Sequence, residues 1–265
     1  MTGRLADRVA VVTGGGAHSE RVFGIGEATC RRFAAEDADV VVVDVDADMV
    51  ELTTDAIADA GDGRVLGIET DLTDEKEIAE MADEIADAFG TVDVLVNNAG
   101  IRIDAGPVTE LDADQLDYIY GVNLRGMALA SKHVIPLMAD GGSIVNISSA
   151  NAELGRPGWS AYDATKAGVL ALTRDMACDH AEEGIRVNSV LPGPTVTDYH
   201  LQGADDPEAR MERSTTPRSD GPGILGRNAH PREIAGGVLF LATEDASYVT
   251  GAALPVDGGL TAAGY

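Results

Sequence analysis

Arg8-Val9-Ala10-Val11-Val12-Thr13-Gly14-Gly15-Gly16 is the stretch that decides the fold. An apolar, β-branched run of this length predicts a buried parallel strand, and the glycines predict a tight turn after it. Further on, Gly24-Ile25-Gly26 opens a segment with the apolar spacing of a helix. Strand, glycines and helix in this order predict a dinucleotide cradle, because glycines let the backbone approach a pyrophosphate and the helix amino terminus offers it unpaired N–H groups.

A second apolar strand is predicted over residues 38–44, and it ends in the carboxylate of Asp44, eighteen residues after Gly26. A dinucleotide-binding unit places at this point the acid that binds the hydroxyls of the adenosine ribose. The same acid repels the 2′-phosphate of NADP. We therefore expect NAD rather than NADP as the cofactor, although in so acidic a chain a strand can also end in Asp by chance.

Strands and helices alternate along the rest of the chain. Further strands are predicted at residues 92–96, 142–147, 185–191 and 253–256, and a long amphipathic helical segment at 112–138. This rhythm predicts an α/β fold, a single Rossmann domain over residues 1–265 with a doubly wound parallel sheet of about seven strands and helices on both faces. A proline- and glycine-rich segment at about 198–223 interrupts the rhythm as an irregular loop, and long loops of this kind are often functional.

Tyr162 and Lys166 are four residues apart, which places both on one face of a helix. Free tyrosine titrates near ~10, so a fixed cation that stabilises the phenolate would bring the phenol toward acid–base work at neutral pH. Ser149 follows the apolar run that begins at Gly142, and strand ends are where open α/β sheets bind ligands. A solvated Tyr–Lys pair and a serine that only caps a turn are the structural alternatives.

Taken together and in order, these residues resemble the short-chain dehydrogenase/reductase family from about residue 7 to residue 259. The matching motifs are Thr13-Gly14, Gly24-Ile25-Gly26, Asp71-Leu72, Asn97-Asn98-Ala99-Gly100, Asn123, Ser149, Tyr162-Asp163-Ala164-Thr165-Lys166, Pro192-Gly193 and Asp257-Gly258-Gly259.

The resemblance implies four catalytic residues. Tyr162 would be the general acid or base, and Lys166 would lower its pKa and bond the nicotinamide ribose. Ser149 would hold the substrate oxygen, and Asn123 would anchor a water that relays protons. The implied cofactor-binding residues are Gly14, Gly24, Ile25, Gly26, Asp44, Asp71, Leu72, Asn98, Ala99, Gly100, Tyr162, Lys166, Pro192, Gly193, Thr195 and Thr197, and residues 198–223 would form the substrate lid.

The chain departs from the family pattern in two places. Residues 17–22 form a six-residue insertion in the phosphate loop, where Arg21 could reach a phosphate and His18 could face the substrate, or where the whole segment is a solvated bulge. Thr195 stands where a branched apolar residue is more usual, and its similar shape leaves room for the same backbone contacts.

The resemblance implies hydride transfer between a nicotinamide cofactor and a secondary alcohol or carbonyl. The lid favours a small polar substrate such as a sugar, polyol or sugar acid, because its polar and basic residues are Tyr199, His200, Gln202, Arg210, Arg213 and Arg218. The alternative is a 3-oxoacyl-thioester (acyl-carrier-protein) reductase, which would want an apolar groove. A more remote alternative is a non-catalytic dinucleotide sensor, which has no reason to keep all four catalytic residues.

The composition limits partners and compartment. With 45 acidic and 19 basic residues the net charge is −26, which repels nucleic acid and anionic membranes. Neither a run of eighteen apolar residues nor a secretory amino end is present, so a cytoplasmic protein is expected. The two cysteines, Cys30 and Cys178, are expected to be buried thiols, and no metal is expected because neither has metal-ligand companions. Residues 232–241 and 248–259 resemble the family's tetramer interface, so a homotetramer is expected.

The excess charge predicts salt dependence and a salt-adapted source. At ~0.01 M salt the Debye length of about 30 Å leaves carboxylate repulsion poorly screened, whereas near 1 M it falls to about 3 Å. The melting temperature and activity should therefore both rise with salt, and subunit contacts should weaken first on dilution of the salt. Thermal scans and light scattering at the two concentrations test this. A flat melting temperature would contradict salt adaptation, and a monomer mass in molar salt would contradict the tetramer.

Overall fold

The structure, a computed structural model, describes residues 3–17, 24–103, 106–201 and 203–263. His18, Arg21 and Gln202 lie outside the described residues, as does the side chain of Tyr199. What the sequence suggested for these four side chains therefore stays a prediction.

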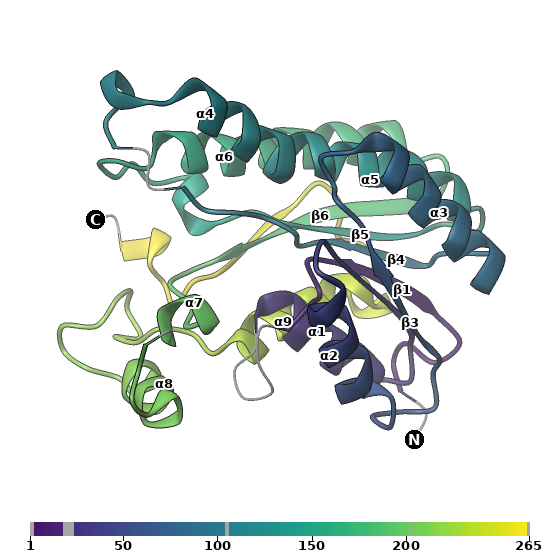
Figure 1. The fold of residues 1–265 in the computed structure, drawn as a ribbon, viewed down its shortest axis with the longest axis horizontal. Helices are drawn as coiled ribbons and strands as arrows, with labels where there is room; N and C mark the ends of the chain where they lie inside the picture. Colours follow the sequence, from purple (N-terminus) through teal and green to yellow (C-terminus); the bar gives the residue numbers. More distant parts are fainter. Residues whose placement is uncertain (1–2, 18–23, 104–105, 202, 264–265) are drawn as a thin grey trace.

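The described strands form one parallel sheet in the order β3-β2-β1-β4-β5-β6-β7, which confirms the predicted doubly wound α/β fold (Figure 1). The chain moves outward from β1 in one direction and then returns to start again at β4, so the strand order reverses between β1 and β4. Open α/β sheets bind ligands at such a reversal. The strands are β1 Val9–Thr13, β2 Asp39–Asp44, β3 Val65–Glu69, β4 Val94–Asn97, β5 Gly142–Ile147, β6 Ile185–Pro192 and β7 Ala253–Val256.

Helices cover both faces of the sheet, with α3, α4, α5 and α6 in one layer and α1, α2 and α9 in the other (Figure 1). Each layer buries its own apolar cluster against the sheet, one around Phe33 and Ile234 and the other around Ile78 and Ile144. The helices are α1 Ile25–Ala34, α2 Ala47–Ile57, α3 Glu75–Phe89, α4 Ala113–Tyr120, α5 Met127–Val134, α6 Ser160–Asp179, α7 Asp198–Leu201, α8 Pro207–Thr215 and α9 Pro231–Ala242.

Aspartates begin four of these helices. The side chains of Asp46, Asp74, Asp112 and Asp206 accept hydrogen bonds from backbone N–H groups in the first turns of α2, α3, α4 and α8. Such caps typically contribute about 1 kcal/mol each, and a negative charge is also favourable at the positive end of the helix dipole. Part of the large acid content therefore stabilises the fold locally.

Three expectations drawn from the sequence need correction. The segment 112–138 is not one regular helix, because a π-helical turn at Gly121–Gly126 separates α4 from α5 and a 3₁₀ turn follows at Ile135–Leu137. The segment 198–223 is not wholly irregular, since α7 and α8 lie within it and pack through Val196, Leu201 and Met211. Cys178 is exposed rather than buried, because it lies on the outer face of α6.

Candidate active site

The glycine turn after β1 is held by close backbone contacts. A Cβ on Gly26 would lie 1.9 Å from the carbonyl oxygen of Gly14, so the first turn of α1 crosses directly over the loop. Gly14 has a φ of +63°, and a Cβ there would lie 2.6 Å from the Cα of Ala99. Only glycine fits at either position. The first N–H groups of α1 receive no side-chain cap, and no side chain projects from Gly14 or Gly26, which fits a pyrophosphate cradle.

Asn98, at the end of β4, fixes the same turn from the other side. Its Nδ2 donates to the carbonyl oxygens of Thr13 and Gly14 at 3.1 and 2.7 Å. The hydroxyl of Thr13 accepts from the backbone N–H groups of Asn98 and Ala99 at 3.1 and 3.2 Å. The ends of β1 and β4 are thus locked together where the strand order reverses.

Asp44 lies beside the turn at the end of β2, as the sequence predicted. One carboxylate oxygen accepts from the backbone N–H of Gly16 at 2.9 Å and the other from that of Val45 at 2.8 Å. A carboxylate oxygen has more than one acceptor site, so both can accept a further hydroxyl. The cradle and the acid together fit the adenosine diphosphate half of a dinucleotide.

Asp71 and Leu72 follow β3 on the same edge of the sheet. The carboxylate of Asp71 accepts from the backbone N–H and the hydroxyl of Thr73, both at 2.8 Å. Leu72 is buried, and a Cβ on Gly126 would lie 2.8 Å from its carbonyl oxygen. These contacts hold the turn after β3 against the π-helical turn.

Asn123 is fully buried and connects three elements. Its Oδ1 accepts from the backbone N–H of Ile101 at 2.7 Å, and its Nδ2 donates to the carbonyl of Ile101 at 2.9 Å and to the hydroxyl of Thr165 at 3.1 Å. The amide thereby ties the π-helical turn to the segment after β4 and to α6. A Cβ on Gly100 would lie 3.2 Å from Lys166 Nζ and 3.3 Å from Asn123 Oδ1, so Gly100 lies beside both side chains.

Lys166 is 3 % exposed and its ammonium donates to the carbonyl oxygen of Ile147 at 2.9 Å. Burial lowers the pKa of this amine to about 8. An ammonium has three donors, so the carbonyl of Ile147 satisfies only part of its capacity.

Tyr162 lies beside the side chain of Ser149. Burial raises the pKa of the phenol, whereas the Ser149 hydroxyl and the charges of Arg156 and Arg102 lower it. Lys166 Nζ lies 5.8 Å from the centroid of the Tyr162 ring and is directed to the carbonyl of Ile147. Arg156 and Arg102, to which the sequence did not point, are therefore cations that lower the pKa of the phenol.

Ser149 also caps the 3₁₀ turn Ala150–Ala152, where its hydroxyl accepts from the backbone N–H of Asn151 at 3.1 Å. Ser149 therefore both caps the turn and lies beside Tyr162, so its structural role does not exclude a catalytic one. The cap orients the hydroxyl that meets the phenol.

The segment after β6 is pinned from two sides. A Cβ on Gly193 would lie 2.5 Å from the Cα of Asp257, which brings the segment against the end of β7. Thr195 pairs with Ala229 in a β-bridge, and its hydroxyl donates to the carbonyl of Gly193 at 2.9 Å. The backbone N–H of Thr197 donates to Nδ1 of His200 at 3.2 Å, which joins Pro192 through Thr197 to α7.

Two features were missed from the sequence. Trp159, just before α6, stacks with the guanidiniums of Arg156 and Arg102, whose Cζ atoms lie 4.0 and 4.8 Å from its ring centroid. The only signal was that this single tryptophan precedes Tyr162 by three residues.

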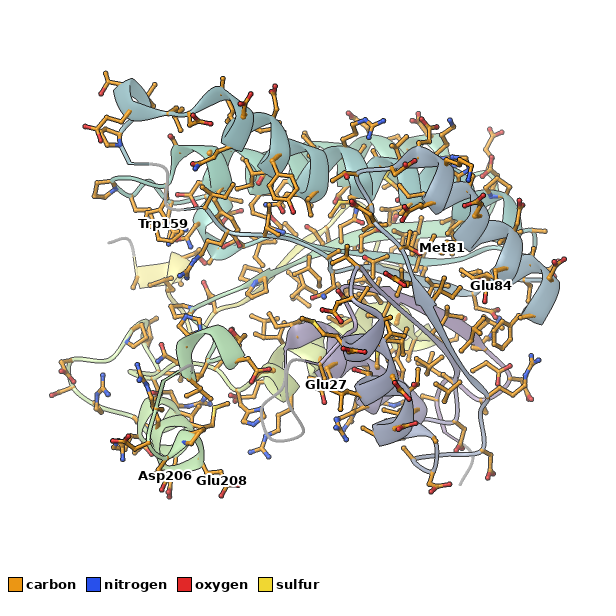
Figure 2. All side chains as sticks on the ribbon, viewed as in Figure 1. Glu27, Met81, Glu84, Trp159, Asp206 and Glu208 are labelled. Carbon is orange, nitrogen blue, oxygen red and sulfur yellow. The ribbon has the colours of Figure 1, made fainter. Side chains whose placement is uncertain are left out.

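The second missed feature is Glu27, in the first turn of α1. It is fully buried and pairs with Arg31 at 2.8 Å, and burial raises its pKa to about 7, opposed by Arg31. Its position beside the glycine turn, labelled in Figure 2, was hidden in the sequence by the abundance of acids.

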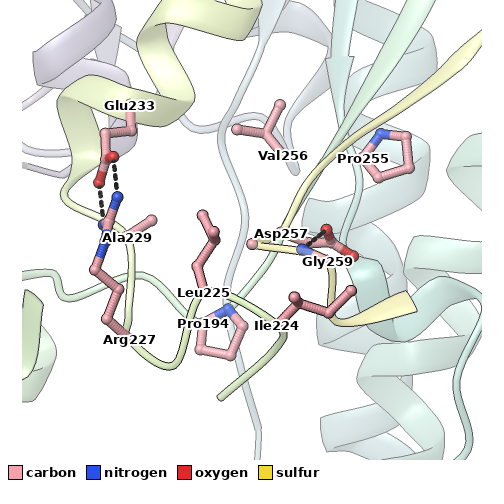
Figure 3. Close-up of a pocket in the computed structure, with 11 residues that line it drawn as sticks. Pro194, Ile224, Leu225, Arg227, Ala229, Glu233, Pro255, Val256, Asp257 and Gly259 are labelled. Carbon is pink, nitrogen blue, oxygen red and sulfur yellow. Dashed lines mark hydrogen bonds and ion pairs between the residues drawn. The ribbon is translucent and has the colours of Figure 1, made fainter. Parts of the chain in front are cut away.

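A cavity of about 420 Å³ lies between the end of the lid and β7 (Figure 3). Its walls include Ile224, Leu225 and Val256, and an ion pair of 2.7 Å between Arg227 and Glu233 stands at one side. Pro194 of the segment after β6 also lines the cavity, whereas none of the four catalytic candidates does.

No cluster of three or more His, Cys, Asp or Glu side chains in the described part of the chain could hold a metal ion. Among the helices of the same residues, none combines the length and apolar character that a membrane crossing needs.

Comparison with known proteins places this geometry in a family. The family model described as Enoyl-(Acyl carrier protein) reductase matches residues 16–261. The cis-4-hydroxycyclohexanecarboxylate dehydrogenase of Sinomonas cyclohexanicum is 42% identical over 259 residues, which cover 97% of this chain and 98% of that protein. The meso-2,3-butanediol dehydrogenase of Serratia marcescens is 37% identical over 260 residues, covering 98% and 96% of the two chains.

The solved structures agree. The crystal structure of levodione reductase superposes with a TM-score of 0.85 at 33% identity, covering 98% of this chain and 99% of that one. Together with the strand order, the glycine turn and the group of Ser149, Tyr162 and Lys166, these matches show that the chain belongs to the short-chain dehydrogenase/reductase family of oxidoreductases.

Proposed function

We propose that the protein is an NAD-dependent dehydrogenase or reductase of small polar secondary alcohols and the corresponding ketones. The observation that carries the proposal is the placement of Tyr162 beside Ser149 and 5.8 Å from the ammonium of the buried Lys166, at the same end of the sheet as the glycine turn. A bound nicotinamide would supply the hydride acceptor in oxidation and the donor in reduction.

The chain's own residues would handle the oxygen and its proton. The hydroxyl of Ser149 and the phenol of Tyr162 would hold the substrate oxygen between them, and the phenol would take or give the proton as the carbon reacts. Lys166 would keep a positive charge close to the phenol and use its remaining donors on the cofactor. Asn123 would hold the backbone of Ile101 and the start of α6 in place.

The cofactor would lie along the edge that runs from Asp44 to Tyr162. Gly14, Gly24, Ile25 and Gly26 would contact the pyrophosphate, and Asp44 the adenosine ribose. Asp71 and Leu72 would lie near the adenine, whereas Asn98, Ala99 and Gly100 would border the nicotinamide ribose. The segment containing Pro192, Gly193, Thr195 and Thr197 would cover the nicotinamide, and residues 198–223 would close over the substrate as a lid.

The names of the relatives support a small alcohol or ketone as substrate, since they include a hydroxycyclohexanecarboxylate and a butanediol dehydrogenase and a levodione reductase. The description of the matching family model favours the thioester alternative. Against it, α8 presents Arg210 and Arg213 among acids and contains no buried residue, which suits a polar substrate better than an acyl chain.

A homotetramer in the cytoplasm completes the proposal. Tyr248 is fully exposed at 103 % and Phe240 on α9 at 38 %. Both lie in or beside the segments 232–241 and 248–259 that were expected to form subunit contacts, and exposed apolar side chains on so acidic a chain favour burial against a second copy.

Replacement of the phenol tests the chemistry. Tyr162→Phe should lower kcat for secondary alcohols by ~10²–10⁴-fold, because proton transfer by a positioned side chain is usually worth that factor. The dissociation constant for NADH should hardly change, since the glycine turn is untouched. Steady-state kinetics and fluorescence titration of NADH measure the two quantities.

Tyr118→Phe is the matched control, because it removes the same hydroxyl from an exposed position on α4. Lys166→Ala should impair both turnover and NADH binding. A Tyr162→Phe enzyme that keeps more than about a tenth of the wild-type rate would contradict the role of the phenol.

Cofactor choice is tested at Asp44. The wild type should prefer NAD over NADP by about tenfold or more in kcat/KM, because a carboxylate close to a 2′-phosphate costs more than the 1.4 kcal/mol that equals a factor of ten. Asp44→Asn should reduce the preference, whereas Asp48→Asn, an exposed acid on α2, should leave it unchanged. Equal efficiencies of the wild type with both cofactors would refute NAD selectivity.

A further inference from the structure

Basic side chains gather around Tyr162 although basic residues are scarce, with 19 against 45 acids. Arg102 comes from the segment after β4, Arg156 from the loop before α6, and Arg210 from α8 of the lid. The Arg156 guanidinium lies 5.8 Å from the Tyr162 ring centroid, and Arg102 and Arg210 both lower the pKa of His200 on α7. Cations from two separate segments therefore lie beside Trp159 and Tyr162, where the substrate would react.

The two arginines nearest Tyr162 differ in exposure. Arg156 pairs with Asp163 through two hydrogen bonds of 2.9 and 3.2 Å, and its side chain is only 30% exposed. This pair fixes the Arg156 guanidinium against Trp159. Arg102 is exposed and covers the same indole ring.

The backbone on both sides of Arg102 is held. Ile101 is bonded through both its N–H and its carbonyl to Asn123, and Gly106 forms a β-bridge with Trp159. A guanidinium that is positioned before the ligand arrives loses less entropy on binding. Trp159, on whose ring the Arg102 guanidinium stacks, is labelled in Figure 2 on the side that faces α7 and α8.

From this arrangement we infer that Arg102 binds a carboxylate of the substrate, so that the enzyme acts on hydroxy or oxo carboxylic acids whose reacting carbon lies at Tyr162. The inference rests on the proposed dehydrogenase function and narrows its substrate class. A planar guanidinium matches a carboxylate with two parallel N–H donors. The guanidinium would also offset the repulsion between an anionic substrate and a chain of net charge −26.

The cofactor is the less suitable partner for Arg102. The pyrophosphate cradle lies at the start of α1, and Asp44, at the end of β2, marks the position of the adenosine ribose. Arg102 instead follows β4 and stacks on the residue three before Tyr162. It therefore stands on the substrate side of the site.

Kinetics with matched substrates tests the inference. The probes are hydroxycarboxylic acids such as 3-hydroxybutyrate and gluconate, each paired with its neutral primary amide, at constant ionic strength. Arg102→Gln should raise KM for an acid by about 10- to 100-fold, the loss expected for a hydrogen bond between charged groups. KM for the amide should stay unchanged, and any change in kcat should be the same for acid and amide, because Arg102 also lowers the pKa of Tyr162. Arg174→Gln, which removes the same charge from an exposed position on α6, is the control.

A binding measurement separates this inference from the proposed function. Trp159 is the only tryptophan of the chain and contacts Arg102, so its fluorescence reports on ligands at that guanidinium. Titration of the Tyr162→Phe protein with 3-hydroxybutyrate should give a saturable change that the amide does not give. The change should disappear in the Tyr162→Phe, Arg102→Gln double variant and persist with Arg174→Gln.

The outcomes are distinct. Suppose that the fluorescence titration saturates but the wild-type enzyme oxidises none of the alcohols. This result would refute the dehydrogenase proposal and leave carboxylate binding at Arg102 standing. Turnover in which Arg102→Gln changes KM equally for acid and amide, or for neither, would refute the role of Arg102 and leave the dehydrogenase proposal intact. A fluorescence titration of the Tyr162→Phe, Arg102→Gln double variant that matches that of Tyr162→Phe alone would also refute the role of Arg102.

Discussion

The close approach of three backbones at the reversal of strand order is the constraint on which the rest of the site depends. A Cβ at Gly26 would meet the carbonyl of Gly14 at 1.9 Å, and a Cβ at Gly14 would meet Ala99, so α1, the turn after β1 and the segment after β4 pack without side chains between them. Asn98 then donates a hydrogen bond to the turn, and Asn123 accepts one from Ile101, three residues after Asn98. Through these contacts the position of the cofactor cradle fixes the position of the substrate wall.

The positions of the charged side chains matter more in this protein than their numbers. Acids are abundant, and several serve as helix caps where negative charge is favourable. Cations are few, and two guanidiniums lower the pKa of the half-buried Tyr162, where reduced dielectric strengthens their effect. Burial alone would make the phenol a poor acid–base group, because it raises the pKa. The hydroxyl of Ser149 and the arginines act in the opposite direction.

The site joins groups that hold different parts of a substrate. Ser149 and Tyr162 lie after β5 and on α6, and the proposed carboxylate site at Arg102 lies after β4, the neighbouring strand. Because parallel strands end at the same edge, short segments from adjacent strands converge there. An oxygen held at one end and a carboxylate at the other would orient the reacting carbon toward the cofactor. This two-point attachment accounts for the shared role of Trp159, which contacts Arg102 at its face and Tyr162 at its edge, with ring centroids 6.3 Å apart.

The sequence by itself determined the glycine turn and the strands other than β3, because apolar runs and backbone sterics act over a few residues, whereas β3 contains Gly67 and buries only Ile68. The order in which the strands pair is known from the tertiary structure. It also determined that Tyr162 and Lys166 share a helix, since a spacing of four is a local property. Only the tertiary structure decided the π-helical turn at Asn123, the two short helices of the lid, the exposure of Cys178 and the convergence of Arg102 with Arg156 on Trp159. Arg102 and Trp159 are far apart in sequence and meet through the packing of two strand ends, a contact that leaves no periodic signal. The same reason explains why burial, which sets the pKa of Lys166 and Tyr162, could not be read from the residues alone.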